Sequence, residues 1–177
     1  MNYIFSAIFL YFFLGFLLYI FQRRIVFNKS GHPGAPKDYN LDNTEEVYIK
    51  TEDNLKLLSW YHKGNNSLPL IVYFHGNSFH IGDRAYRIQR YIEKNWSVLL
   101  VSWRGFGGNE GNPTEKNLYK DAEAVLKWIK NNTEFKFKEV VIYGESLGSG
   151  AAVEMGTKYE FLSLSLIHIS EPTRLTM

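Results

Sequence analysis

The chain has 177 residues, of which 45% are hydrophobic and 16% aromatic, and its 20 basic and 18 acidic residues leave a net charge of +2. This composition is typical of a folded domain. It excludes a disordered chain, an acidic tail and a nucleic-acid-binding surface that depends on a large basic surplus. The sequence contains no cysteine, which excludes a disulfide scaffold, a cysteine-based zinc site and a cysteine nucleophile.

The chain opens with a long apolar stretch: residues 3–21 carry no charge, and the first charged side chain is Arg23. Nineteen helical residues span about 28 Å, close to the hydrocarbon thickness of about 30 Å. A cleaved signal peptide is the alternative, but Met1-Asn2 carries no basic residue and no small-x-small cleavage site follows. A buried core helix is also possible, although the stretch has no polar face. We therefore expect a transmembrane anchor over residues 1–22, with residues 3–21 in the lipid bilayer.

Basic residues lie only on the C-terminal side of this stretch, at Arg23, Arg24 and Lys29. The positive-inside rule then predicts a single-pass membrane protein with its main domain in the cytoplasm. Residues 23–43 form a juxtamembrane connector. It is rich in glycine, proline and polar residues from residue 28 onward, and we expect no regular structure there.

The remaining chain alternates between strand and helix patterns. The first two expected strands form a hairpin, and the later ones are continuous apolar runs, as in buried parallel strands. Expected strands are 46–51, 55–62, 70–74, 98–101, 140–143 and 161–167, and expected helices are 82–94, 114–131 and 148–158. This alternation predicts the α/β class, with a mostly parallel sheet and crossover helices.

One motif carries chemistry: Gly144-Glu145-Ser146-Leu147-Gly148, between an expected strand and an expected helix. A G-x-S-x-G sequence at that place is typical of a nucleophile elbow, a sharp turn that exposes a serine hydroxyl at the sheet edge. The two glycines flank the turn where a Cβ would clash. The N–H of Leu147, at the helix N-terminus, can donate to an oxyanion. Because the pattern also occurs by chance, Ser146 is at this point a candidate nucleophile.

A second element supports the first. His75-Gly76-Asn77 directly follows the buried strand that ends at Phe74, where the second oxyanion donor of such a site is expected. The N–H of Asn77 is the candidate donor. His75 is better interpreted as a structural residue of the turn than as a catalytic base.

Taken together, these blocks resemble the α/β-hydrolase superfamily. The matching segments, in order, are residues 73–77, 103–111, Asp121 and 144–150. The chain is most similar to membrane-anchored serine hydrolases of the serine aminopeptidase or hydrolase-4 type, a branch that includes depalmitoylating thioesterases. The resemblance, over about residues 22–163, implies Ser146 as nucleophile and the N–H groups of Asn77 and Leu147 as the oxyanion hole. It also implies that residues 104–107 shape a loop beside the pocket, unless they serve only the turn.

The chain departs from that family after the elbow. A serine nucleophile needs a base and an orienting acid, which in this fold follow it in the order acid, then histidine. Glu160 and His168 have that order, but one further strand cannot supply both groups from two later strand ends. We therefore expect the acid and the base to be absent from this chain.

Near the C-terminus, residues 164–174 resemble an in-frame translation of a sequencing-library adapter. We accordingly expect residues 44–163 to be the N-terminal half of an α/β-hydrolase domain and residues 164–177 to be a non-native tail. Such a fragment would be inactive and, with a bare sheet edge, prone to aggregate.

The sequence thus favours a serine hydrolase that cleaves an ester, thioester or amide of a small molecule or an acylated protein. The alternatives are a non-catalytic, membrane-tethered binding module on the same scaffold, and a helix that tethers a partner-binding domain. We expect no cofactor and no metal, because the histidines lack ligand spacing and residues 105–108 match no phosphate-binding or dinucleotide-binding loop.

Overall fold

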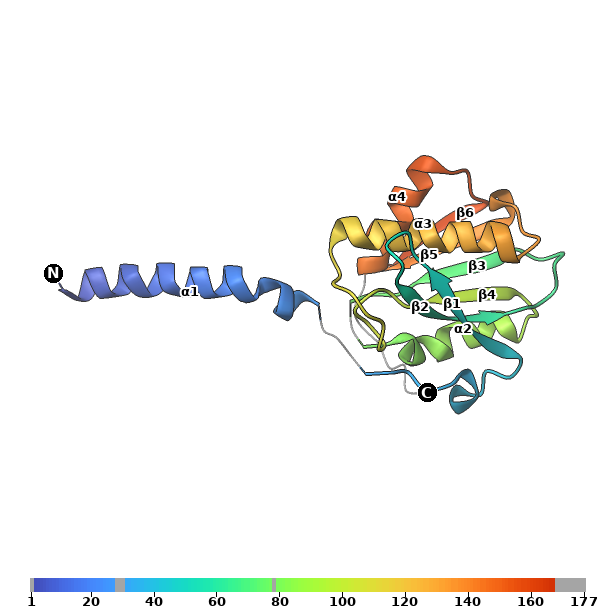
Figure 1. Ribbon diagram of the computed structural model, residues 1–177, viewed down its shortest axis with the longest axis horizontal. Helices are drawn as coiled ribbons and strands as arrows, with labels where there is room; N and C mark the ends of the chain where they lie inside the picture. The colour runs from blue at the N-terminus through green and yellow to red at the C-terminus, as the bar shows by residue number, and fades with distance from the viewer. Residues whose placement is uncertain (1, 28–30, 78, 168–177) are drawn as a thin grey trace, which may run out of the picture.

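The computed structural model describes residues 2–27, 31–77 and 79–167, which form one long helix and an α/β domain (Figure 1). The helix, α1 (Asn2–Val26), projects away from the domain, and nearly all of its residues from Tyr3 to Gln22 are exposed. The segment Tyr3–Gln22 is long and apolar enough to cross a membrane. Exposed phenylalanine, leucine and isoleucine side chains on every face of a helix are unfavourable in water, so this helix needs an apolar environment.

The domain is built on one six-stranded sheet in the order β1-β2-β4-β3-β5-β6. The strands are β1 (Thr44–Lys50), β2 (Lys56–His62), β3 (Leu70–Phe74), β4 (Ser97–Val101), β5 (Val140–Glu145) and β6 (Ser163–Ile167). The hairpin β1–β2 and the pair β2–β4 are antiparallel, whereas β4, β3, β5 and β6 are parallel. The predicted α/β class with a mostly parallel sheet is therefore confirmed.

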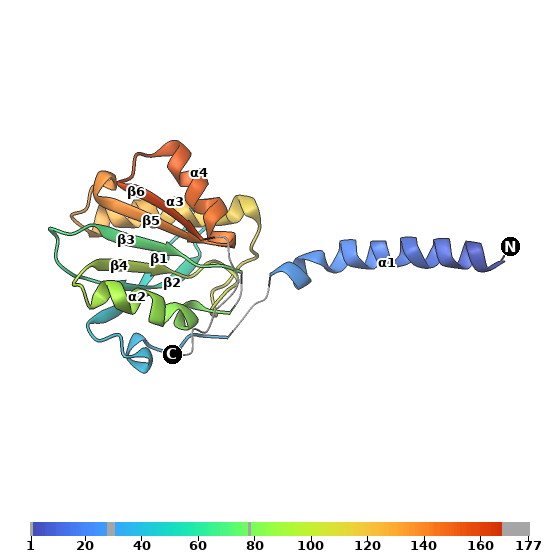
Figure 2. The ribbon, with the colours of Figure 1, turned by 180° about the vertical axis from the view of Figure 1, so that it is seen from behind.

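Helices cover both faces of this sheet, as Figures 1 and 2 show. Helices α3 (Glu115–Asn132) and α4 (Leu147–Lys158) pack on one face, and α2 (Ala85–Ile92) packs on the other. Successive residues of β3 alternate between the two cores: Val72 and Phe74 belong to the first, Ile71 and Tyr73 to the second. Because β3 is buried on both faces, it reads as a continuous apolar run in the sequence.

The structure corrects two expectations about local structure. The predicted helix 82–94 is a 3-10 turn, η2 (Ile81–Arg84), followed by the shorter α2. The connector, expected to be irregular, contains the 3-10 helix η1 (Pro36–Tyr39). Proline at its first position has a φ suited to a helix start, and the carboxylate of Asp38 accepts from the N–H of Ala35 at 2.9 Å.

The strand predicted over residues 161–167 is present as β6, which pairs with β5. Its residues are exposed or half-buried, unlike those of β3. The expected boundary between native chain and tail at residues 163–164 falls inside this strand and stays a prediction. His168 and residues 169–177 lie outside the described residues.

Candidate functional site

Ser146 occupies the sharp turn between β5 and α4. Its backbone has φ 47° and ψ −109°, a conformation that non-glycine residues rarely adopt. Its N–H donates to the carbonyl of Ile167 at 2.8 Å, and its own carbonyl accepts hydrogen bonds from the backbone and the hydroxyl of Ser149. These bonds hold the strained turn from both sides, which is the geometry that the G-x-S-x-G motif predicted.

The glycines on either side of Ser146 are required by close backbone contacts. A Cβ on Gly148 would overlap the backbone carbonyl of Phe74 in β3, and one on Gly144 would lie 2.7 Å from Cα of Ser149. Helix α4 therefore approaches the sheet more closely than any side chain would permit. The clash of a Cβ expected at both glycines is therefore present in the structure.

The loop after β3 lies directly beside the serine. A Cβ placed on Gly76 would be 3.3 Å from Cβ of Ser146, so the backbone of Gly76 borders Ser146. Leu147 is the first residue of α4, and the first N–H groups of a helix have no partner within it. Leu147 directly follows Ser146 and Asn77 directly follows Gly76, and the catalytic roles of Ser146, Asn77 and Leu147 stay predictions.

His75 is enclosed in the protein interior. Its side chain is fully buried, its Nδ1 lies 2.6 Å from the carbonyl oxygen of Gly76, and its carbonyl accepts from the Trp103 indole at 2.9 Å. Burial lowers the pKa of His75 to about 4, and the charge of Arg84 adds to this effect. The ring is therefore neutral at pH 7 and holds the turn together, in agreement with the structural interpretation.

A buried ionic cluster, which sequence reasoning missed, joins the elbow to the neighbouring loop. Glu145 accepts from Nη2 of Arg84 at 2.9 Å and from the hydroxyl of Tyr73 at 2.6 Å. Burial by itself would raise the pKa of Glu145, but these two donors outweigh it and hold the pKa below its ordinary value. In the sequence, this cluster was indicated only by the charge of Glu145 inside a motif that predicts a tight, buried turn.

Arg104 belongs to a second buried cluster. Its guanidinium donates to Asp121 at 2.6 Å and to Asp53, in the β1–β2 turn, at 2.7 Å. The hydrogen bonds from Arg104 hold the pKa of Asp53 below its ordinary value. Arg104 therefore fastens the hairpin to α3, which supports the turn interpretation of residues 104–107 over substrate contact.

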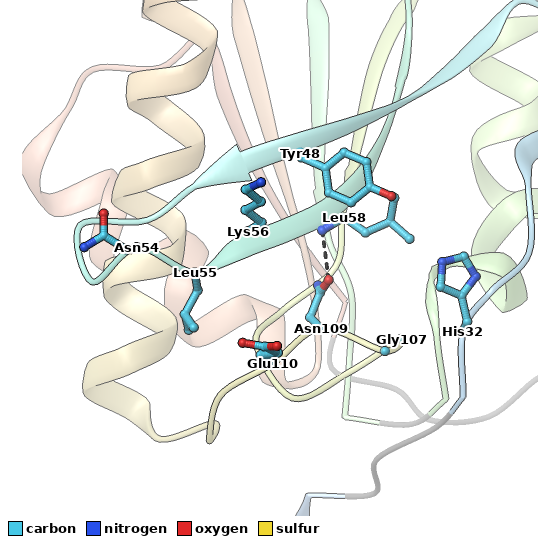
Figure 3. Close-up of a pocket in the computed structure, with 10 residues that line it drawn as sticks. His32, Tyr48, Asn54, Leu55, Lys56, Leu58, Gly107, Asn109 and Glu110 are labelled. Carbon is cyan, nitrogen blue, oxygen red and sulfur yellow. Dashed lines mark hydrogen bonds between the residues drawn. The ribbon is translucent and has the colours of Figure 1, made fainter.

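Other candidate groups lie apart from the serine. Glu160 is exposed and forms an ion pair with Lys138 at 2.9 Å. A cavity of about 470 Å³ lies between the β1–β2 hairpin and the loop 107–110, where Asn109 accepts from the N–H of Leu58, and its lining does not include Ser146 (Figure 3). Within the part of the chain that the structure describes, no three histidine, aspartate or glutamate residues could together hold a metal ion.

Comparison with known proteins gives the family. Residues 66–170 match the family described as "Serine aminopeptidase, S33". The chain is 29% identical to the "Uncharacterized membrane protein YNL320W" of Saccharomyces cerevisiae, over 82% of this chain and 53% of that protein. It is 28% identical to "Lysophosphatidylserine lipase ABHD12" of Danio rerio, over 68% of this chain and 36% of that protein.

A solved structure has a similar fold. The esterase Pf2001 of Pyrococcus furiosus superposes with a TM-score of 0.60 at 28% identity, covering 72% of this chain and 51% of that chain. The chain spans about half the length of the curated relatives it matches. From the family match over more than half of its residues and from its fold, the chain belongs to the serine aminopeptidase S33 family of α/β-hydrolases.

Proposed function

We propose that the whole protein is a membrane-anchored serine hydrolase that cleaves an ester, thioester or amide by acyl transfer. The observation that carries this proposal is the strained elbow at Ser146, with the backbone of Gly76 directly beside it. A serine in that conformation would present its hydroxyl to a substrate. The loop after β3 and the start of α4 would then lie on either side of the reacting carbonyl.

The reaction would run in two steps. Ser146 Oγ attacks the substrate carbonyl, a histidine takes the proton, and the N–H groups of Asn77 and Leu147 stabilise the oxyanion. The leaving alcohol, thiol or amine receives that proton, and water then releases the acyl group from the serine. We expect the histidine and its acid in the part of the family fold that this chain does not span.

A membrane anchor favours substrates at the bilayer, namely lipids and acylated proteins. The apolar helix α1 and the similarity to a yeast membrane protein support the anchor. The similarity to a lysophosphatidylserine lipase supports a lipid ester as substrate. The basic residues that follow the anchor in the sequence support a cytoplasmic domain.

The test begins with the gene. The source DNA is sequenced across the codon for Ser163 to a stop, and the complete protein is assayed on p-nitrophenyl butyrate beside Ser146→Ala and the 177-residue chain. We expect Ser146→Ala to lose about 10⁴-fold or more of the activity. Ser67→Ala, on the exposed loop before β3, is the matched control.

Two results would contradict the proposal. A reading frame that ends after residue 177 would favour the non-catalytic binding module. Full activity in the Ser146→Ala variant of a longer protein would remove Ser146 as the nucleophile.

A further inference from the structure

The described residues of the connector between α1 and the sheet pack on the domain. Phe27, the first residue after α1, packs edge-on against Phe106, with 6.5 Å between the ring centroids. Phe106 is buried and in turn packs against the ring of His75 at 5.5 Å. A chain of three aromatic rings therefore joins the end of the membrane helix to the loop beside Ser146.

Further contacts hold Pro33 and Tyr39 of the connector against the domain. Pro33 is buried, and its ring lies 3.6 Å from the Cβ position of Gly107. The hydroxyl of Tyr39 donates to the carbonyl of Pro33 at 2.7 Å, and its ring packs on Trp60 at 5.4 Å. These contacts leave the described part of the connector little freedom to act as a loose tether.

The length of α1 sets how far the domain lies from the bilayer. The apolar span ends at Gln22, and Phe27 follows five residues later, or about 7.5 Å along a helix. The headgroup layer on each side of a bilayer is about 5–7 Å thick. With Tyr3–Gln22 in the hydrocarbon, this rise would place the contact between Phe27 and Phe106 at the outer boundary of the headgroups.

The same side of the domain carries the nucleophile. The parallel strands end at Phe74, Val101, Glu145 and Ile167, and α1 extends from the side toward which these strands point (Figures 1 and 2). Two exposed aromatic side chains come after β3, which ends at this edge: Phe79 is 56% exposed and Tyr86, in the first turn of α2, is 58% exposed. Phe79 also has a φ of 62°, a costly conformation for a bulky residue.

We propose that this edge is a bilayer-docking surface, with Phe79 and Tyr86 at the membrane–water interface and Ser146 opening toward the lipid. Aromatic side chains favour that depth, and Arg87, which packs over the ring of Tyr86 at 5.4 Å, supplies a charge for anionic headgroups. The inference rests on the anchor and the nucleophile of the proposed function. It adds that substrate reaches the serine from the membrane side.

The absence of cysteine makes a direct test possible. The 177-residue chain is reconstituted in vesicles of phosphatidylcholine and phosphatidylserine that contain doxyl-labelled phosphatidylcholine. A fluorescent label is attached at Phe79→Cys, Tyr86→Cys or, as matched control on the opposite edge, Ser67→Cys. We expect quenching at least about two-fold stronger at positions 79 and 86 than at position 67, as for groups in the headgroup layer.

A further variant tests the packed connector. Phe27→Ala in the Phe79→Cys background should reduce the quenching while the protein still sediments with the vesicles. Equal quenching at the three positions, or no effect of Phe27→Ala, would overturn the inference and leave the anchor and Ser146 untouched. Protein that fails to sediment with vesicles would instead refute the anchor, and the docking with it.

Discussion

Arg84 Nη2 lies 2.9 Å from Glu145 Oε1, although the two residues are 61 positions apart and their side chains are only 9% and 10% exposed. Glu145 directly precedes Ser146. Arg84 is the last residue of η2, which follows the loop that contains His75 and Gly76. The pair therefore ties together the two segments that border Ser146.

Removing one member of this pair should destabilise the fold. Arg84→Met leaves the carboxylate of Glu145 buried without its cation, and we expect the free energy of unfolding to fall by about 3 kcal/mol. Urea unfolding of the chain in detergent, followed by tryptophan fluorescence, measures this. Lys138→Met is the matched control, because its ion pair with Glu160 has the same 2.9 Å distance but is exposed. Equal losses in the two variants would contradict the role of burial.

Helix α4 offers a matched pair of glycines. Gly148→Ala introduces a methyl group into the backbone of Phe74 and should destabilise the domain by about 2 kcal/mol or more. Gly150, in the same helix, has no atom within 4 Å of its Cβ position, so Gly150→Ala should stabilise by about 0.5–1 kcal/mol. Thermal unfolding of both variants checks the prediction, which is refuted if their effects have the same sign.

The Arg104 cluster depends on the shape of the guanidinium as well as on its charge. Arg104→Lys keeps the charge but loses the planar fork whose separate nitrogens donate to Asp53 and Asp121, so we expect a loss of about 2 kcal/mol. The measurement is again the urea midpoint. Lys158→Arg, at an exposed ion pair with Glu123, is the control and should leave the midpoint unchanged. A midpoint unchanged in Arg104→Lys would show that charge alone holds the hairpin.

His75 predicts a dependence of stability on pH. Its pKa of about 4 lies below the ordinary value of 6.5, so between these values the unfolded chain binds a proton that the folded chain does not. Stability should therefore be complete above pH 6.5 and fall by about 3 kcal/mol as the pH drops to 4. His62, whose pKa is also lowered by burial, adds a contribution of the same sign. Urea titrations at several pH values measure the total.

The variant His75→Gln isolates the contribution of His75. It should be less stable at pH 7 but should lose most of the pH dependence between 6.5 and 4.5. Glu145 contributes in a lower window, because its pKa is held below the ordinary value of 4.5 and its stabilisation disappears only in more acidic solution. An unchanged slope in His75→Gln would assign the effect to other groups.

Much of the fold could be predicted because its signals are local. The continuous apolar run of residues 70–74 indicated a strand buried on both faces, and Thr114 indicated the start of α3, where its hydroxyl accepts from the N–H of Asn117 at 3.2 Å. Ser146 and its flanking glycines were identifiable because a sharp strand-to-helix turn imposes its residue types within five positions. The start of α2 was misplaced, because a 3-10 turn replaces the first helical turn at Ile81–Arg84.

The sequence by itself determined the apolar helix, the α/β alternation, the elbow serine and the loop beside it, since each depends on residues close together in the chain. Only the tertiary structure decided which distant side chains meet: Arg84 with Glu145, Arg104 with Asp53 and Asp121, and Phe27 with Phe106. These partners are brought together by sheet order and by packing on a shared core. Composition and periodicity do not encode such contacts, because they specify faces and elements but not which elements become neighbours.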